Sequence, residues 1–418
     1  MGLLPCSLSY QPNEESESQS NSNHFHSESS NSFISSQSSL PSVLSLTPSS
    51  SQQLDQTSTT HHHCISTLKG HSSYIFSLAL AGKHLYSGAS NSEIRVWSRN
   101  PSSPECSPCS VVSSSKSAVK SLVVLGDRLI SAHQDHKIRV WKINDAPYQQ
   151  YTCMVILPTL NDRVVKLFSA KNYVQVRRHK KCTWVHHVDT VSALALSKDG
   201  SLLYSASWDR TFKVWQTSDF KCLESVQNAH EDAINAIALS NDGFAYTGSA
   251  DRKIKVWKKH EGDKRHTLVA TLEKHRSAVN ALALSTDGSV LYSGACDRSI
   301  IVWEKNVGGG GDGDGCGGGG HMAVAGALRG HTKAILCLAV VSDLVCSGSA
   351  DKTVRIWRRG VGKNYSCLAV LEGHRGPVKC LTAAVDSCNN NGSGTSYLVY
   401  SGSLDCDIKI WQIWVPFL

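Results

Sequence analysis

The first 60 residues of this 418-residue chain lack lysine and arginine altogether. They contain twenty serines, and their charged side chains are the acids Glu14, Glu15, Glu17, Glu28 and Asp55. A polar segment this poor in hydrophobic residues cannot bury enough surface to fold by itself. We therefore expect residues 1–60 to form a disordered acidic tail. The whole chain carries a formal charge of +8 and the tail −5, so residues 61–418, the expected folded domain, carry +13.

A long apolar run is also lacking. No stretch approaches the roughly 20 residues that cross a membrane, and no basic start precedes an apolar core, as in a secretory signal peptide. The fifteen cysteines show no disulfide-framework spacing and suit a reducing compartment. We expect a protein of the cytoplasm and nucleus with no membrane partner. Residues 177–181 are either an import signal or, as is commoner for such basic runs, a solvated loop.

The motifs of an enzyme are lacking as well. The glycine-dense residues 308–320 are followed by no Gly-Lys-Ser/Thr, so we interpret them as a flexible linker and not a phosphate loop. Cys106 and Cys109 have metal-like spacing, but no second pair stands at zinc-finger distance. The apolar strands expected at the centre of the fold offer no cluster of acids or histidines. We predict no catalytic residue, no cofactor and no metal.

What the sequence does contain is a repeat. Seven times an Asp, once replaced by Asn, stands six residues before a Trp, with apolar alternation between them. The spacing from Trp215 to Trp257 is 42 residues, close to the roughly 40–45 residues of a four-stranded propeller blade. We predict an all-β, seven-bladed propeller. The pairs are Asn91/Trp97, Asp135/Trp141, Asp209/Trp215, Asp251/Trp257, Asp297/Trp303, Asp351/Trp357 and Asp405/Trp411.

Two further positions recur with each pair. A Ser or Thr precedes the Asp by four residues, as Ser87, Ser131, Ser205, Thr247, Ser293, Ser347 and Ser401. A His opens six repeats, as His71, His187, His230, His275, His331 and His374. These four positions resemble the WD40 family over about residues 64–415. The resemblance implies a buried hydrogen-bonded network in each blade, which agrees with the rule that buried polar groups need partners.

Departures from the pattern predict irregular blades. Asn91 replaces the Asp in repeat 1, and Ser115 stands where a His would open repeat 2. We expect incomplete networks and lower local stability in both blades. Residues 158–181 are too few for an eighth blade and form an insertion. We place blade insertions at residues 144–182, 306–325 and 386–396, and expect residues 64–68 to pair with residues 407–413 and close the ring.

Basic residues recur at one predicted face, which we take as the partner-binding surface. They follow the repeat Asp (Arg210, Arg252, Arg298, Lys352) or lie near the opening His (Arg276, Lys333, Arg375). Tyr74 and Trp208 are aromatic hot-spot candidates on this face. Trp208 has an equally good structural interpretation, packing on its neighbouring blade. Proteins with acidic surfaces are the expected partners. Nucleic acid is disfavoured because few aromatic residues interleave with the basic ones.

The serine-rich front, the insertion and the seven repeats together resemble the plant JINGUBANG-type WD40 proteins. That resemblance implies a non-enzymatic regulator that binds other proteins, including transcription factors, in programmes such as pollen germination and growth. We expect a monomer outside its complexes. Thr47-Pro48 is a candidate proline-directed phosphorylation site. The alternative function is a substrate receptor of a cullin-type ubiquitin ligase. Such receptors usually carry Trp-Asp-x-Arg, and no repeat Trp here is followed by Asp.

Overall fold

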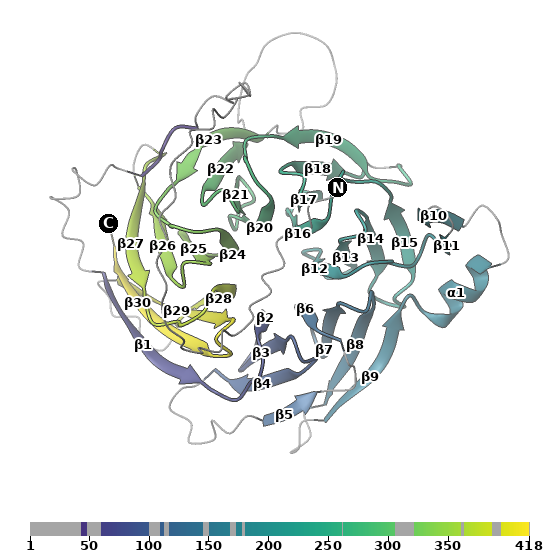
Figure 1. The fold of residues 1–418 in the computed structure, drawn as a ribbon, viewed down its shortest axis with the longest axis horizontal. Helices are drawn as coiled ribbons and strands as arrows, with labels where there is room; N and C mark the ends of the chain where they lie inside the picture. Colours follow the sequence, from purple (N-terminus) through teal and green to yellow (C-terminus); the bar gives the residue numbers. More distant parts are fainter. Residues whose placement is uncertain are drawn as a thin grey trace, which may run out of the picture. The chain divides into compact units, whose positions relative to one another are not determined.

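Seven antiparallel sheets of four strands surround a common axis in the computed structural model (Figure 1). The structure describes residues 43–47, 60–99, 109–112, 117–144, 150–167, 173–177, 180–260, 262–305, 322–360, 363–386 and 394–417. These residues show the all-β, seven-bladed propeller that the repeats predict. Cys106, Ser115, Arg178 and the glycine-rich residues 308–320 lie outside the described residues.

Each blade runs from an inner strand at the axis to an outer strand at the rim. Blade 1 contains β2 (Ile75–Ala81), β3 (His84–Ala89), β4 (Ile94–Ser98) and β5 (Cys109–Val112). Blade 2 contains β6 (Val119–Leu125), β7 (Arg128–His133), β8 (Ile138–Asn144) and β9 (Gln150–Leu157). Blade 3 contains β12 (Val191–Leu196), β13 (Leu202–Ser207), β14 (Phe212–Gln216) and β15 (Cys222–Val226).

The remaining blades repeat this order. Blade 4 contains β16 (Ile234–Leu239), β17 (Phe244–Ser249), β18 (Ile254–Lys258) and β19 (Thr267–Leu272). Blade 5 contains β20 (Val279–Leu284), β21 (Val290–Ala295), β22 (Ile300–Lys305) and β23 (Met322–Leu328). Blade 6 contains β24 (Ile335–Val341), β25 (Leu344–Ser349), β26 (Val354–Arg359) and β27 (Tyr365–Leu371). Blade 7 contains β28 (Val378–Val385), β29 (Gly394–Ser403), β30 (Ile408–Pro416) and β1 (His61–Leu68).

Small residues on the second strand let neighbouring blades approach closely. A Cβ on Gly294 of β21 would lie 2.4 Å from Cγ2 of Ile335, the first residue of the next inner strand. Gly402 meets Ile75 in the same way, across the junction between blades 7 and 1. Ile75 and Ile335 are fully buried as a result. The Ser-Gly pair of the repeat is thus a packing signal as well as part of the hydrogen-bonded network.

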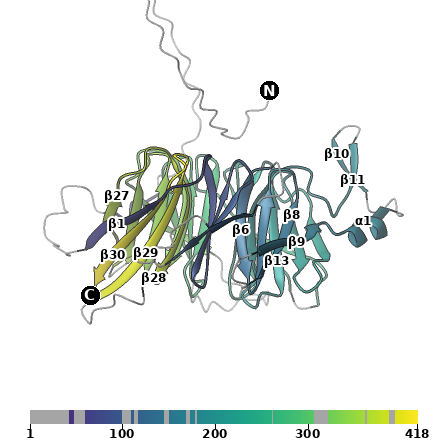
Figure 2. The ribbon, with the colours of Figure 1, turned by 90° about the horizontal axis from the view of Figure 1, so that it is seen from below.

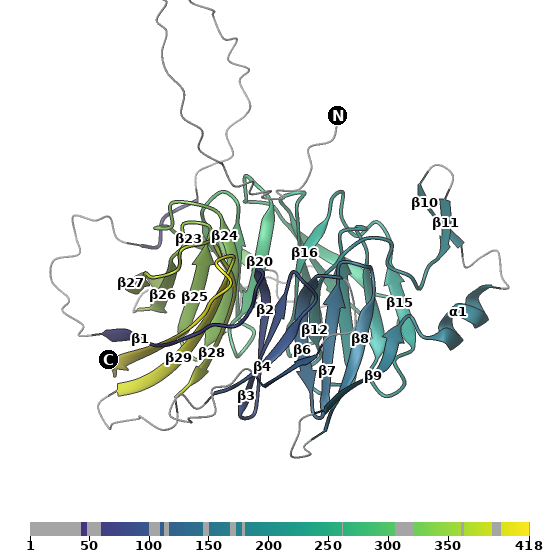
Figure 3. The ribbon, with the colours of Figure 1, turned by 60° about the horizontal axis from the view of Figure 1, so that its bottom comes forward.

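The ring closes by pairing the two ends of the propeller. β1 pairs antiparallel with β30, and Cys64 faces Trp411 while Leu68 faces Ile408. In Figure 1, β1 runs along the outside of β30, and Figure 3 shows β1 close to the C-terminus. This confirms the predicted pairing of residues 64–68 with residues 407–413. The pairing covers the outer edge of β30, because β1 supplies the fourth strand of blade 7.

The insertion after blade 2 is a small subdomain and not a blade. It contains α1 (Leu160–Leu167) and a hairpin of β10 (Tyr173–Arg177) and β11 (Lys180–Thr183). All three elements lie outside the ring beside blade 3 (Figures 1 and 2). The backbone N–H of Cys222 in β15 donates to Asp162 of α1 at 3.0 Å, which fastens the helix to the rim. The exact bounds predicted for the three insertions stay predictions.

One short part of the serine-rich tail lies against the propeller. Residues 43–47 contact β23 and β27, and Leu46 is buried there. Val43–Leu418 accordingly form one compact unit. The predicted disorder of the rest of the tail falls on residues outside the described ranges and stays a prediction.

Candidate functional site

Four side chains of each repeat converge at one end of the blade. In blade 5, Nδ1 of His275 is 2.9 Å from Asp297, and its Nε2 is 2.8 Å from Oγ of Ser293. The indole N–H of Trp303 donates to the same Oγ at 2.8 Å. The imidazole of His275 thus bridges the carboxylate and the serine hydroxyl, with each ring nitrogen in hydrogen-bond range of one of them. The carboxylate also accepts from the backbone N–H of Arg276 at 2.9 Å.

Four other blades contain the same set of hydrogen bonds, at 2.8–2.9 Å. The sets are His187, Ser205, Asp209 and Trp215 in blade 3; His230, Thr247, Asp251 and Trp257 in blade 4; His331, Ser347, Asp351 and Trp357 in blade 6; and His374, Ser401, Asp405 and Trp411 in blade 7. Recurrence in five blades marks the set as structural, because a catalytic site is normally single.

Blade 1 departs from the set at Asn91. His71 still bonds Ser87 through Nε2 at 2.7 Å. Its Nδ1 lies 3.5 Å from a carboxylate oxygen of Glu93 but finds no hydrogen-bond partner among the described residues. Asn91 instead accepts from the backbone N–H of Glu93. Burial, together with nearby Arg95, lowers the pKa of His71 to about 4. The incomplete network expected of this blade therefore takes the form of one unsatisfied ring nitrogen.

Blade 2 has the incomplete network expected of it, without a His–Asp hydrogen bond, but it does contain a histidine. His133, the last residue of β7, turns back so that its Nε2 lies 2.8 Å from Ser131, where an opening His would bond. Its Nδ1 meets the backbone carbonyl of Ser117 at 3.2 Å. Asp135 is then free of the imidazole and pairs with Arg139. His133 is not predictable from the repeat spacing, because an opening His precedes the inner strand and His133 ends the second strand.

The carboxylates of the network are held ionised. Burial alone raises the pKa of Asp297, but hydrogen bonds from His275 and Ser299 outweigh it and bring the pKa to about 2. The pKa of Asp209 and that of Asp405 are lowered for the same reasons, with the paired imidazole as the main opposing influence on burial. In the blades that keep the repeat Asp, a negative charge thus stands beneath the turn and orients the backbone N–H groups around it.

The network sets the conformation of the turn that carries the basic residues. Asp297 accepts from the backbone N–H of Ser299 at 3.0 Å, and Arg298 N–H donates to the carbonyl of Ala295. The residue after the repeat Asp therefore has a positive φ in all seven blades, at Ser92, His136, Arg210, Arg252, Arg298, Lys352 and Cys406. A three-residue hairpin loop of this kind favours Gly at that position. Four of the seven positions carry an exposed basic side chain instead: Arg210, Arg252, Arg298 and Lys352.

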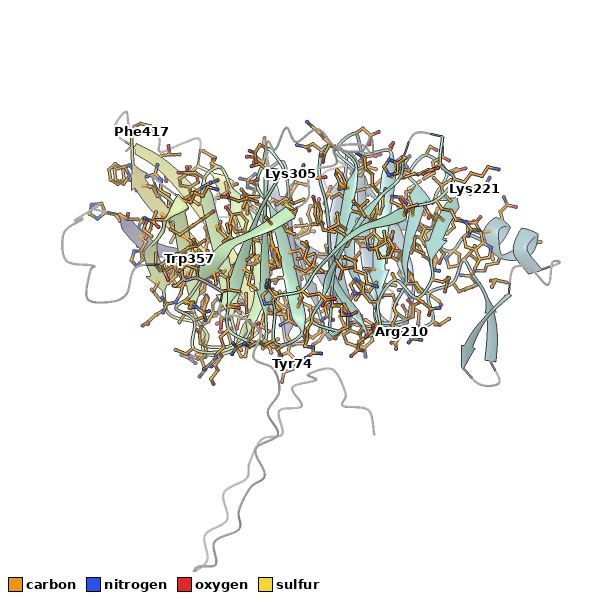
Figure 4. All side chains as sticks on the ribbon, turned by 90° about the horizontal axis from the view of Figure 1, so that it is seen from above. Tyr74, Arg210, Lys221, Lys305, Trp357 and Phe417 are labelled. Atoms are coloured by element: carbon orange, nitrogen blue, oxygen red, sulfur yellow. The ribbon has the colours of Figure 1, made fainter. Side chains whose placement is uncertain are left out.

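The predicted binding residues share this face. Figure 4 shows Tyr74 and Arg210 on one side of the propeller, and Lys221, Lys305 and Phe417 on the other. Tyr74 is 40% exposed, and the seven basic residues are exposed too. None of these seven makes an ion pair with any residue that the structure describes: Arg210, Arg252, Arg276, Arg298, Lys333, Lys352 and Arg375. We call Tyr74, Trp208 and these seven residues the basic face.

The basic face is not uniformly positive. In blade 4 the loop after the opening His carries Glu231, where blades 5 and 7 carry Arg276 and Arg375. Glu231 lies 3.7 Å from Lys253, which also pairs with Glu273 at 3.2 Å. The unpaired positive charge is therefore concentrated on the turns of blades 3 to 6 and on the opening loops of blades 5 to 7.

Trp208 packs toward a lysine of the neighbouring blade. The ammonium group of Lys120 on β6 lies 5.6 Å from the centre of the Trp208 ring and 4.2 Å from the centre of the Phe76 ring. Burial, with a contribution from Lys379, lowers the pKa of Lys120 to about 8. Trp208 is half-buried. The packing predicted as the structural alternative is thus present, and the remaining exposed part of the ring still belongs to the basic face.

Substituting glycine at one of these turns distinguishes the effect of a residue on stability from its effect on partner binding. We expect Arg252→Gly, at φ 71°, to raise the free energy of unfolding by up to about 1 kcal/mol, because a left-handed non-glycine residue is strained. The same variant is expected to capture less partner. Cys406→Gly, at φ 70°, relieves similar strain without removing a positive charge and should keep full capture. Urea unfolding and partner pull-down test both variants; equal capture by the two would contradict a binding role for Arg252.

The comparisons with known proteins agree with this architecture. The WD domain, G-beta repeat model matches residues 62–98, 179–216, 220–258, 266–304, 323–358 and 365–412. These segments cover more than half of the chain, so the protein belongs to the WD40-repeat family, whose propellers generally serve as protein-interaction scaffolds and are usually non-enzymatic. The matched segments pass over blade 2, where no histidine precedes the inner strand.

Two curated relatives are distant. The chain is 22% identical to protein tipD of Dictyostelium discoideum over 276 residues, which are 62% of this chain and 39% of that protein. It is 27% identical to an uncharacterized WD repeat-containing protein of Schizosaccharomyces pombe over 166 residues, 39% of this chain and 42% of that protein. The chain thus spans about two fifths of the length of these relatives.

Metal-binding clusters and membrane-spanning helices are two further kinds of site that the described ranges could hold. No group of three or more His, Cys, Asp or Glu side chains there could hold a metal ion. No helix in those ranges has the length and apolar character needed to cross a bilayer.

Proposed function

We propose that this WD40 protein is a non-enzymatic scaffold whose basic face binds acidic surfaces of partner proteins. The observation that carries the proposal is the set of seven exposed Arg and Lys side chains without ion-pair partners among the described residues. Unpaired charges on one face attract an oppositely charged partner and speed its association. Tyr74 and the exposed part of Trp208 add aromatic contacts of the kind that dominate interface energies.

The identity of the partners is a further part of this proposal. The resemblance to the plant JINGUBANG-type proteins supports partners that include transcription factors, action in cytoplasm and nucleus, and a role in a developmental programme such as pollen germination and growth. The proposal also includes that the chain is a monomer outside these complexes, and that it binds proteins in preference to nucleic acid. The basic face supports it by offering charge with few aromatic side chains for base stacking.

Charge reversal on the basic face is the test. We expect Arg210→Glu combined with Arg252→Glu and Arg298→Glu to lose the specific partners recovered by affinity purification from native tissue. The wild-type interaction should weaken with added salt, because exposed charges are screened over about 8–10 Å. Mass spectrometry of the recovered proteins at two salt concentrations gives the readout.

The opposite face offers a matched control. Lys83, Lys198 and Lys221 are exposed and lie on the turns at the other end of the blades. Figure 4 labels Lys221 on that side. Reversing these three charges changes the net charge by the same amount and should leave the partners bound. If both triple variants lose the same partners, net charge and not the basic face governs binding, and the proposal fails.

A further inference from the structure

A five-residue segment of the tail is held at the rim by backbone hydrogen bonds. The N–H of Leu46 donates to the carbonyl of Ala327 in β23 at 2.9 Å, and the N–H of Ala327 donates to the carbonyl of Leu44 at 2.8 Å. The N–H of Tyr365, the first residue of β27, donates to the carbonyl of Leu46 at 3.0 Å. Residues 43–47 therefore join the outer strands of blades 5 and 6 (Figure 1).

One side chain of the segment is the anchor. Leu46 is only 8% exposed and belongs to a buried cluster with Tyr292, Leu328 and Tyr365. Leu44, two residues earlier, is 73% exposed. Val43 is partly buried and packs against a different hydrophobic cluster, between blades 4 and 5. We call the space between the outer strands β23 and β27 that residues 43–47 fill the groove. It buries a leucine side chain at one position and leaves the side chain two residues earlier exposed.

The groove is shaped for a backbone to approach closely. A Cβ on Gly326 of β23 would lie 2.4 Å from Cγ of Leu46 and 2.9 Å from the carbonyl oxygen of Leu44. The three atoms nearest to that Cβ all belong to the docked segment. Glycine at position 326 therefore makes room for the segment, and a side chain there would occupy the space that Leu46 fills.

The remaining contacts are few and polar. The guanidinium of Arg329 donates to the carbonyl of Val43 at 3.2 Å, and the hydroxyl of Thr47 donates to the carbonyl of Arg329 at 3.5 Å. No acidic side chain of the segment takes part, because residues 43–47 contain none. Recognition rests on main-chain hydrogen bonds and one apolar pocket, which is how an extended peptide adds to the edge of a sheet.

We propose that the groove between β23 and β27 is a second binding site, for an extended, uncharged peptide with a leucine at the position of Leu46, and that residues 43–47 occupy it in cis. Partner proteins would present the same pattern in an extended segment. They compete with the tail segment, whose covalent attachment gives it a millimolar effective concentration. This site is separate from the basic face, so either can fail without the other.

A labelled peptide of residues 42–48, Ser-Val-Leu-Ser-Leu-Thr-Pro, is the probe. We expect the full chain with Leu46→Asp to bind it at least ten times more tightly than the wild-type chain, because an aspartate cannot enter the apolar pocket and the cis competitor leaves. Leu44→Asp is the matched control, since that side chain is exposed, and it should behave as wild type. Adding Gly326→Ala to Leu46→Asp should abolish binding. Fluorescence anisotropy measures all four chains.

Hydrogen exchange provides a readout that does not depend on the peptide. The amides of Ala327 and Tyr365 should exchange faster in Leu46→Asp and stay protected in Leu44→Asp. Unchanged protection in Leu46→Asp would show that the tail segment does not cover the groove. Equal peptide affinity of the wild-type and Leu46→Asp chains, or tight binding that survives Gly326→Ala, would likewise overturn the proposal.

Discussion

Thr247→Val is expected to lower the free energy of unfolding by about 3–5 kcal/mol. Valine has the shape of threonine without its hydroxyl, and Thr247 is fully buried. Its Oγ1 contacts Nε2 of His230 at 2.8 Å and accepts from the indole N–H of Trp257 at 2.9 Å. The substitution leaves both nitrogens buried without partners, at about 1–3 kcal/mol each.

Thr247→Ser is the matched control for this prediction. The other six blades already use serine at this position, and in each of them its Oγ bonds a histidine and a tryptophan. Losing one buried methyl group should cost no more than about 1 kcal/mol. Urea midpoints of the two variants give the comparison. Similar midpoints would mean that methyl packing, and not the hydroxyl, is what blade 4 requires.

Acidification from pH 6.5 to pH 4 is the second change with a large expected effect. Burial is the main cause that lowers the pKa of both His71 and His133 to about 4. An unfolded histidine titrates near 6.5, so the unfolded chain binds these two protons first and stability falls as the pH drops through this window. The loss is up to about 3 kcal/mol for each histidine. The carboxylates affect stability at a lower pH. The pKa of Asp297 is about 2, so its contribution to the free energy of unfolding is lost only below about pH 4.

The variant His133→Gln removes one of the two histidines and so tests its share of the pH dependence. Glutamine keeps a polar contact for Ser131 and carries no titrating group, so the variant should be less stable at pH 8 yet lose less stability between pH 7 and pH 5. Thermal unfolding midpoints across that range measure the slope. A slope equal to that of the wild type would show that His133 is not one of the groups that take up a proton on unfolding.

The repeat made the fold predictable, because it fixed the blade number, the closing strand pair and the four converging side chains. Each of these depends on spacing, and spacing is visible in a single sequence. The turns carrying Arg210, Arg252 and Arg298 were predictable for the same reason. These three residues are exposed and lie in the hairpin loops that follow the repeat Asp.

Two features could not be found by spacing. The opening position of repeat 2 is Ser115, and His133 lies eighteen residues after it. His133 nevertheless bonds Ser131 as an opening histidine would, and only the fold shows this contact. Residues 43–47 lie in a serine-rich stretch whose composition predicts disorder. The one available signal was the alternation of Leu44, Ser45 and Leu46, which is too short to stand out from its surroundings. Gly326, which receives the segment, is far away in sequence.

The pairing of β1 with β30 also governs when the propeller can be completed. Lys409 of β30 bonds Thr67 of β1 across 342 residues of sequence. At roughly 5–20 residues per second, a ribosome needs about 20 to 70 s to make that length of chain. Throughout this time β1 has been synthesised but has no partner, and the growing array of blades ends in an open edge that other strands can join. Ring closure therefore cannot begin before β30 has been synthesised, however early the first blades fold.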